Sequence, residues 1–439
     1  MVNDAARTAK RAARVALACI FIGCAPDVAR GTGGTDRQPG ACGRGLVVVS
    51  SDYQSSSVAL VDTRGASLSP RFLSSASADV GLSSALSGDV VLPTSAALGS
   101  ELVVIDRYPA SVLSVVDVAT GSVRAQLDVR TGFASNPQDF LGISSNAGWV
   151  SRYGSNPTPG GEPFDEGGDL LLLDLSRPAI EARLDLAPAM RDAPGFLPRP
   201  GRMVALGDLV FVLLSAYDVT FASSAPSRLA AFDGKTRALR GVRVLEGLHG
   251  CSALALEPPY AADAQPLAAR RLAVGCSGEF AGGASPSLAR AGIALFQAND
   301  AMTELARFMA EDLVDRPIGF DLDFDERGGL VAVGFGSLDG PGPSTDALFR
   351  LDLETGAVAI VATTASRPFE LGGVRCIHRR FAVDPSSGAG SACTEACYVA
   401  DGERGALLRL EPSGEGMALT GELSIGDGVG LPPRVLEIF

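Results

Sequence analysis

Short apolar segments separated by polar turns fill most of this chain, and one arrangement of them recurs seven times. In each copy an apolar segment of the Leu-Val-x-Val type is followed by a polar turn and by a second apolar segment that ends in Asp. Neighbouring segments such as Phe-Asp-Leu-Asp-Phe-Asp at 320–325 alternate with the period of two that half-buried strands require. The copies begin at Leu46, Leu102, Trp149, Leu209, Leu272, Leu330 and Tyr398. The pattern predicts repeated β-strands.

A repeat of this kind predicts a ring of packed sheets. One unit cannot bury its own apolar face, so neighbouring copies have to pack on one another. Each unit is expected to form an innermost strand, the Leu-Val strand, the strand ending in Asp, and an outermost strand such as 123–129. We therefore predict an all-β fold, a seven-bladed β-propeller of four-stranded antiparallel blades.

Six segments are predicted as innermost strands, namely 88–93, 136–144, 202–207, 251–257, 318–325 and 376–384. The first unit begins directly at Leu46 and has no such segment before it. The chain ends with Arg434 to Phe439, after the last outer strand. We predict that this end pairs with the Leu46 strand, so that the N- and C-terminal strands share one blade. Such closure removes exposed strand edges.

The repeats resemble the YVTN-type β-propeller repeat of bacterial surface and exported proteins, which is related to the lactonase-like propellers. The plainest copies are 102–129 and 330–361, and the resemblance covers nearly the whole chain after residue 45. It implies a seven-bladed propeller and a location in the cell envelope. It specifies the fold better than the function, because one fold hosts many activities.

The start of the chain has the features of an export signal. A basic stretch over 7–14 precedes an apolar run over 15–22, which is too short to span a bilayer. The run ends in Phe-Ile-Gly-Cys, which resembles a bacterial lipobox with Cys24 as the lipidated residue. Phe21 stands where such a motif usually has Leu, so cleavage by an ordinary signal peptidase stays open as the alternative.

Three parts are predicted: a signal peptide over 1–23, a lipidated flexible tether over 24–44, and the propeller over 45–439. The tether is rich in Gly and polar residues and has no apolar period. Ala25, which follows Cys24, resembles the signal for outer-membrane sorting. We predict a lipid-anchored protein of the bacterial envelope, at the outer membrane, that contacts the membrane through its anchor only. A net charge of −13 argues against nucleic acid as a partner.

Cysteine usage agrees with export. Apart from Cys19 in the signal and Cys24, the cysteines are Cys42, Cys251, Cys276, Cys376, Cys393 and Cys397. An even number in an exported protein suggests disulfides. Cys251 and Cys276 lie symmetrically about a loop between adjacent strands, as directly opposed residues do. The same construction pairs Cys376 with Cys397, with Cys393 as the rival, and leaves Cys42 with Cys393 or free.

Candidate chemistry is sparse, and no cofactor or metal is predicted. A zinc site is disfavoured because the chain has two histidines and no Cys-x-x-Cys pair. Asp321, Asp323 and Asp325 have calcium-loop spacing, but Glu326 occupies the place of the required Gly, so strand alternation explains them better. The two histidines, His249 and His378, fall at or in innermost strands, where a structural role is favoured over a metal or catalytic one.

Four of the six tyrosines directly follow the second strand of their unit: Tyr53, Tyr108, Tyr153 and Tyr217. The same connection is lengthened in the middle units, at 152–168, 216–228, 277–291 and 334–347. Equivalent connections lie on one face of a propeller, and loops on a rigid scaffold commonly form binding sites. We predict a binding face with these tyrosines as apolar contacts. The alternative is that each ring caps its own blade.

These features together favour a non-catalytic envelope lipoprotein whose propeller binds a protein or glycan of the cell envelope through one loop face. One alternative is a lactonase-like propeller hydrolase with a site in the axial funnel, built from His378, Asp321, Asp323 and Arg379. Another is a purely structural subunit of an envelope complex. A polar funnel with buried paired acids would favour the enzyme, and an apolar plugged axis would exclude it.

Overall fold

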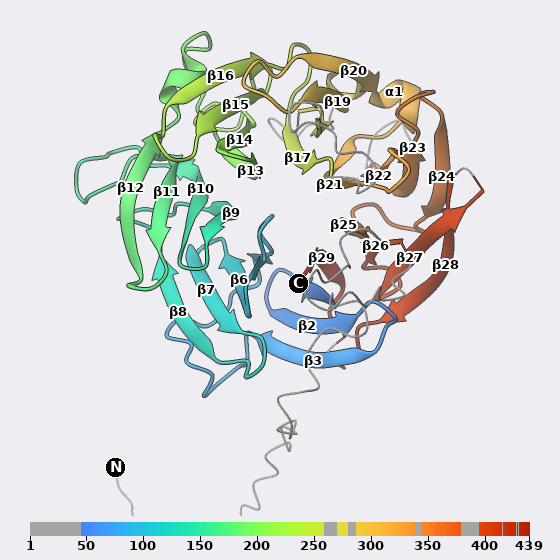
Figure 1. The fold of residues 1–439 in the computed structure, drawn as a ribbon, viewed down its shortest axis with the longest axis horizontal. Helices are drawn as coiled ribbons and strands as arrows, with labels where there is room; N and C mark the ends of the chain where they lie inside the picture. The colour runs from blue at the N-terminus through green and yellow to red at the C-terminus, as the bar shows by residue number, and fades with distance from the viewer. Residues whose placement is uncertain are drawn as a thin grey trace, which may run out of the picture. The chain divides into compact units, whose positions relative to one another are not determined.

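The chain forms a ring of seven antiparallel sheets that stand around a central axis (Figure 1). The computed structural model describes residues 45–258, 270–279, 287–338, 344–378, 395–414, 416–426, 428 and 430–439. This is the predicted all-β, seven-bladed propeller. Within these ranges the α-helix is limited to the single turn α1 (Ala310–Leu313), and none is long and apolar enough to cross a membrane.

Six blades run outward from the axis in sequence order. The second blade contains β4 (Val90–Val91), β6 (Glu101–Asp106), β7 (Val112–Asp117) and β8 (Val123–Asp128), with β5 (Ala97–Leu98) also paired to β6. The third contains β9 (Pro137–Ser144), β10 (Ala147–Ser155), β11 (Gly167–Asp174) and β12 (Ala179–Asp185). The fourth contains β13 (Pro200–Leu206), β14 (Leu209–Leu214), β15 (Arg228–Asp233) and β16 (Leu239–Val244).

The remaining blades repeat this order. The fifth contains β17 (Cys251–Leu256), β18 (Arg271–Ser277), β19 (Ala291–Gln297) and β20 (Glu304–Met309). The sixth contains β21 (Ile318–Phe324), β22 (Leu330–Gly334), β23 (Ala347–Leu351) and β24 (Val358–Thr363). The seventh contains β25 (Leu371–Ile377), β26 (Ala396–Asp401), β27 (Ala406–Ser413) and β28 (Gly416–Ser424). The described residues also include the 3-10 turns η1 (Ala187–Met190) and η4 (Leu288–Arg290).

The first blade joins the two ends of the propeller, as predicted. From the axis outward it contains β29 (Pro433–Ile438), β1 (Gly45–Ser51), β2 (Ser56–Asp62) and β3 (Ser67–Ser74). In the register of β1 and β29, Leu46 lies opposite Ile438 and Val48 opposite Leu436. Figure 1 shows the chain end, marked C, beside β29 near the axis. The closing strand therefore occupies the innermost position that the first unit lacks.

Apolar side chains from facing sheets fill the spaces between the blades. Leu60 and Leu102 are fully buried between the first and second blades. Leu46 and Tyr398 are buried between the seventh blade and the first, so packing reinforces the closure. Trp149, the sole tryptophan, is 2% exposed and belongs to the core.

One innermost strand was placed wrongly from the sequence. The segment 376–384 was predicted as the inner strand of the seventh blade, but β25 begins at Leu371 and ends at Ile377. The glycines of β25 explain the error. Glycine weakens the sequence pattern of a strand, but it is also found in strands where another segment's backbone packs closely. A Cβ on Gly372 would lie 2.0 Å from the carbonyl oxygen of Arg434, and one on Gly373 would lie 2.8 Å from the backbone N of Leu436.

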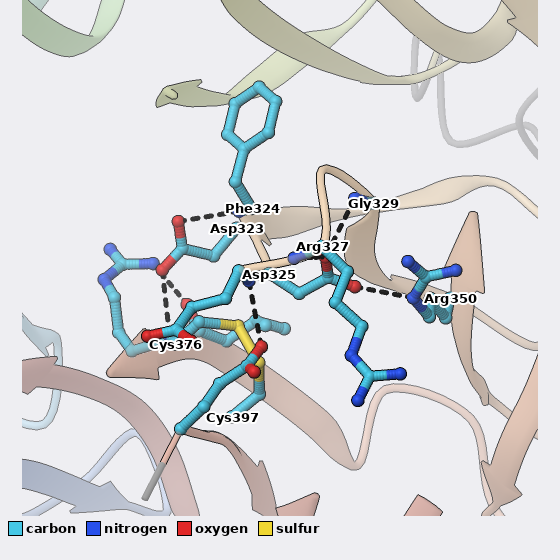
Figure 2. Close-up of a disulfide and its surroundings, with 12 residues drawn as sticks. Asp323, Phe324, Asp325, Arg327, Gly329, Arg350, Cys376 and Cys397 are labelled. Carbon is cyan, nitrogen blue, oxygen red and sulfur yellow. Dashed lines mark hydrogen bonds and ion pairs between the residues drawn. A yellow bond between two sulfur atoms is a disulfide. The ribbon is translucent and has the colours of Figure 1, made fainter. Parts of the chain in front are cut away.

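Two disulfides join an innermost strand to the second strand of the same blade. Cys251 lies opposite Cys276 and is bonded to it, with 3.7 Å between their Cα atoms. Cys376 lies opposite Cys397 and is bonded to it, with 3.9 Å between their Cα atoms. These are the pairs that the hairpin symmetry predicts, and Figure 2 shows the second. Cys42 and Cys393 lie outside the described residues.

Adjacent strands run antiparallel, so the connections between second and third strands lie at the same end as the segments that lead into the innermost strands. We call this end the loop face, which includes residues 52–55, 107–111, 156–166 and 215–227. The lengthened connections of the middle blades therefore share one face. Parts of two of them, 280–286 and 339–343, lie outside the described residues.

Candidate functional site: an aromatic funnel on the axis

A cavity of about 570 Å³ opens on the axis at the loop face. We call it the axial funnel. Its wall is built from the first residues of innermost strands and from loop-face connections. It carries seven aromatic rings, those of Tyr53, Tyr153, Tyr217, Phe221, Phe320, Phe335 and Phe369. Its charged side chains are those of Arg107, Arg202, Arg434, Asp89 and Asp321. The axis at this end is therefore an aromatic cavity with a few charges at fixed places.

Three rings from the third and fourth blades form one wall. Phe221 stacks on Tyr153 with 6.1 Å between ring centroids, and it lies 5.8 Å from Tyr217. The guanidinium of Arg199 lies 4.2 Å from the Phe221 centroid and 5.5 Å from that of Tyr153. Burial raises the pKa of the Tyr153 phenol, which Arg199 only partly counteracts. These contacts hold the wall rigid.

A second wall comes from the sixth blade and the segment entering the seventh. Phe335 is its centre, with ring centroids 5.1 Å from Phe320 and 5.1 Å from Phe369. Phe320 belongs to β21 and is 53% exposed, although it sits on an innermost strand. A large ring held at the axis with half its surface in solvent is available for contact with a ligand.

The four tyrosines singled out in the sequence divide into two pairs. Tyr53 lines the funnel and is 69% exposed. Tyr108 is 61% exposed but does not line the funnel. Tyr153 and Tyr217 belong to the packed wall, and Tyr217 is only 7% exposed. The first pair can meet a partner at the loop face, while the second pair has mainly a packing role.

Each funnel arginine donates hydrogen bonds to neighbouring side chains or backbone carbonyls. Arg107 donates from Nε to Asp89 at 3.0 Å and from Nη1 to the Gln138 side chain at 3.1 Å. Arg434 donates from Nη1 to the Phe369 carbonyl at 2.8 Å and to Glu370 at 3.1 Å.

The third of them, Arg202, donates from Nη1 to the Leu92 carbonyl at 3.1 Å and lies 3.8 Å from Asp139. The sequence reasoning did not single out these arginines or the four phenylalanines. These residues share a position at or next to a loop-face connection. The sequence reveals that position only when the strand boundaries of each blade are known.

Buried acids lie below the funnel, between the sixth, seventh and first blades. Arg375 donates from Nη1 to both oxygens of Asp321, each at 2.7 Å, and from Nε to Glu437 at 2.6 Å. Asp323 accepts from the backbone N–H of Cys376 at 2.9 Å, as Figure 2 shows. Burial raises the pKa of Asp323 to about 6 and that of Glu437 to about 7, while Arg375 lowers both.

The residues proposed for a hydrolase site are divided between the two ends of the axis. Asp321 lines the funnel, but Asp323 lines a cavity at the opposite end, and His378 lies there too. Arg379 lies outside the described residues. His249 precedes β17 at the loop face, where its Nδ1 lies 2.8 Å from the Ser224 hydroxyl, so the two histidines do not meet.

Burial lowers the pKa of both histidines. Among the described residues, His, Cys, Asp and Glu form no group of three or more that could hold a metal ion.

The sequence matches no protein-family model and no curated protein. Among solved structures, the chain is similar to a candidate 6-phosphogluconolactonase from Bacteroides uniformis ATCC 8492, with a TM-score of 0.50 and 12% identity over 90% of this chain and 99% of that one. A candidate 6-phosphogluconolactonase from Bacteroides fragilis NCTC 9343 gives a TM-score of 0.49 and 12% identity over 90% and 98% of the two chains. AztD from Citrobacter koseri gives a TM-score of 0.43 and 10% identity over 90% of this chain and 98% of that one. At such identities the likeness concerns the fold alone, which is that of a seven-bladed β-propeller.

Proposed function

We propose that this protein is a non-catalytic binding propeller of the bacterial cell envelope, anchored through Cys24, that holds a protein or glycan at its loop face. The observation that carries the proposal is the gathering of exposed rings around one concave site. Tyr53, Phe221, Phe320 and Phe369 all line the funnel, and each is more than one-third exposed. Exposed apolar groups around a cavity are typical of binding sites rather than of surface that contacts only solvent.

The contacts of Asp321 favour binding over hydrolysis. A general base needs an oxygen that can reach the substrate. Both Asp321 oxygens accept from Arg375, and Asp321 also accepts from the backbone N–H groups of Leu322 at 3.1 Å and Val374 at 3.2 Å. Its carboxylate is therefore engaged in joining β21 to β25. Asp323 and Glu437, whose pKa values are raised, line the cavity at the other end.

Replacing Phe320 tests the binding face. Phe320→Ala should weaken capture of partners from a solubilised envelope fraction at least about tenfold, because a half-exposed ring contributes contact area without being needed for folding. The matched control is Tyr153→Ala, which should lower the melting temperature because this ring packs against Phe221 and Arg199. Full-length protein is compared by pull-down, quantitative mass spectrometry and thermal denaturation. Unchanged capture by a folded Phe320→Ala protein would refute the proposed face.

The anchor is tested separately. Cys24→Ser should release the protein from the membrane fraction into the soluble envelope fraction, because lipidation of that thiol provides the membrane attachment. Fractionation of cells and intact mass of the wild type provide the two measurements. A Cys24→Ser protein that stays in the membrane, together with a wild type that carries no lipid mass, would remove the lipoprotein part of the proposal.

A further inference from the structure

We infer that the axial funnel receives an organic anion, a negatively charged head group carried on an apolar body. The inference rests on the proposed function and adds the chemical class of the group that enters the funnel. Three features support it, namely the charges of the wall, two buried polar atoms of its lining residues that have no hydrogen-bond partner, and the placement of the two aromatic walls.

The charge of the funnel is opposite to that of the protein. The chain as a whole has a net charge of −13, yet the funnel wall contains three arginines and two aspartates. One of those aspartates, Asp321, is already engaged by Arg375. The other, Asp89, is engaged by Arg107. Arg434 also contacts Glu370, and Arg202 lies 3.8 Å from Asp139, but neither of these carboxylates lines the funnel. The wall itself therefore presents one more basic than acidic side chain, and a concave site of low polarity strengthens the effect of that charge on an entering anion.

Two buried polar atoms of the wall have no hydrogen-bond partner among the described residues, the Nε of Arg434 and the hydroxyl of Ser252. Both residues line the funnel. A buried donor without a partner destabilises the fold, so such atoms are usually satisfied by water or by a ligand. The Arg434 guanidinium, which lies on the wall, therefore has a donor that no described group satisfies. Guanidinium groups in particular recognise carboxylates and phosphates through paired N–H donors.

The apolar body is indicated by the walls. The rings around Phe221 belong to the third and fourth blades, and those around Phe335 belong to the sixth blade and the entry to the seventh. Arg434 comes from the first blade and Arg107 from the second, which lie between these walls around the ring. An aromatic or aliphatic body could lie between the walls while its head group meets the arginines. A cavity of about 570 Å³ suits a ligand of that size.

The test uses two dyes with the same aromatic skeleton and different charge. The anion 8-anilinonaphthalene-1-sulfonate is compared with neutral N-phenyl-1-naphthylamine by fluorescence titration of the full-length protein. The anion should bind about tenfold more tightly, and Arg434→Gln should lower its affinity by a similar factor while leaving the neutral dye unaffected. Arg107→Gln provides a second variant in case the first is unstable. Phenylbutyrate should displace the anionic dye, and phenylbutanol should not.

A charge-matched control is Arg177→Gln, since Arg177 is 75% exposed on the third blade, away from the funnel. It should leave both affinities unchanged. Equal affinity for the two dyes, with no loss in Arg434→Gln or Arg107→Gln, would overturn the anion inference. In that case, loss of both dyes in Phe320→Ala would leave the proposed binding face intact. Dye binding that Phe320→Ala does not alter would count against both the inference and the face.

Discussion

At the scale of single residues, a buried carboxylate joins three blades. Asp139 lies on β9 and is completely buried. Its oxygens accept from Thr94 of the second blade, through the backbone N at 2.6 Å and the hydroxyl at 2.8 Å, and from the backbone N of Met203 in the fourth blade at 2.6 Å. Asp321 makes the same kind of contact from the sixth blade to the seventh, through Val374. Such aspartates fasten innermost strands that share no ladder.

We expect Asp139→Asn to lower the free energy of unfolding by about 1–3 kcal/mol, because the amide NH₂ would face one of the buried donors that the carboxylate now satisfies. Urea denaturation of the variant and the wild type measures the change. Asp185→Asn is the control, since that side chain is half exposed. Equal unfolding free energies for Asp139→Asn and the wild type would show that the cross-blade contacts contribute little.

Phe320 shows why strand alternation alone did not reveal the funnel. In the segment 320–325 the alternation places Phe320, Leu322 and Phe324 on one face, and Leu322 and Phe324 are indeed buried. Phe320 is exposed because the pairing of β21 with β22 shifts register between Ile318 and Leu322. A bulge of this kind re-aims a side chain and breaks the period of two. No local pattern predicts where a bulge falls.

At the scale of strands, the sequence predicted what depends on local patterns. The Leu-Val strands and the closing strand were placed correctly because apolar runs between polar turns define both. The inner strand of the seventh blade was misplaced because Gly372 and Gly373 interrupt its alternation of apolar and polar residues. Glycine is required at both positions because the backbone of β29, which lies far away in sequence, packs closely against them.

The funnel could not be predicted for the same reason. Its rings come from the fourth, sixth and seventh blades as well as the first and third, and their convergence depends on how the ring closes. The tyrosine pattern pointed to the loop face, where the funnel opens, but it gave equal weight to rings that pack and rings that are exposed.

At the scale of the whole molecule, the ring is closed by a strand that carries a buried acid. Glu437 lies on β29 and accepts from Arg375 of the seventh blade, which also binds Asp321 of the sixth. Asp323 lies nearby on the same strand as Asp321 and interacts with Arg375 electrostatically. Three carboxyl groups thus share one guanidinium at the point where the ends of the propeller meet. Burial of more than one negative charge around a single cation is unfavourable, and a proton relieves it.

The direction of the pH effect follows from the raised pKa values. Glu437 has a pKa of about 7 in the folded protein against an ordinary value of 4.5. Between pH 4.5 and about pH 7, its carboxyl group is therefore protonated in the folded state and ionised in the unfolded state. Stability therefore falls as pH rises from 4.5 to about 7, by linkage. Asp323, with its pKa raised to about 6, acts in the same direction. His249 and His378 act in the opposite direction, because burial lowers their pKa values.

A Glu437→Gln variant separates these contributions, since Gln keeps the shape of the side chain and does not titrate. Relative to this variant, the wild type should lose on the order of 2–3 kcal/mol of unfolding free energy between pH 5 and pH 7.5, because each pKa unit corresponds to about 1.4 kcal/mol. Denaturation at a series of pH values measures the difference between the two proteins, and the histidine contributions cancel in it. Parallel stability curves for the two proteins would mean that Glu437 stays ionised in the closed ring. A wild-type curve that falls more steeply than that of Glu437→Gln would show that mild acid strengthens the closure of the propeller.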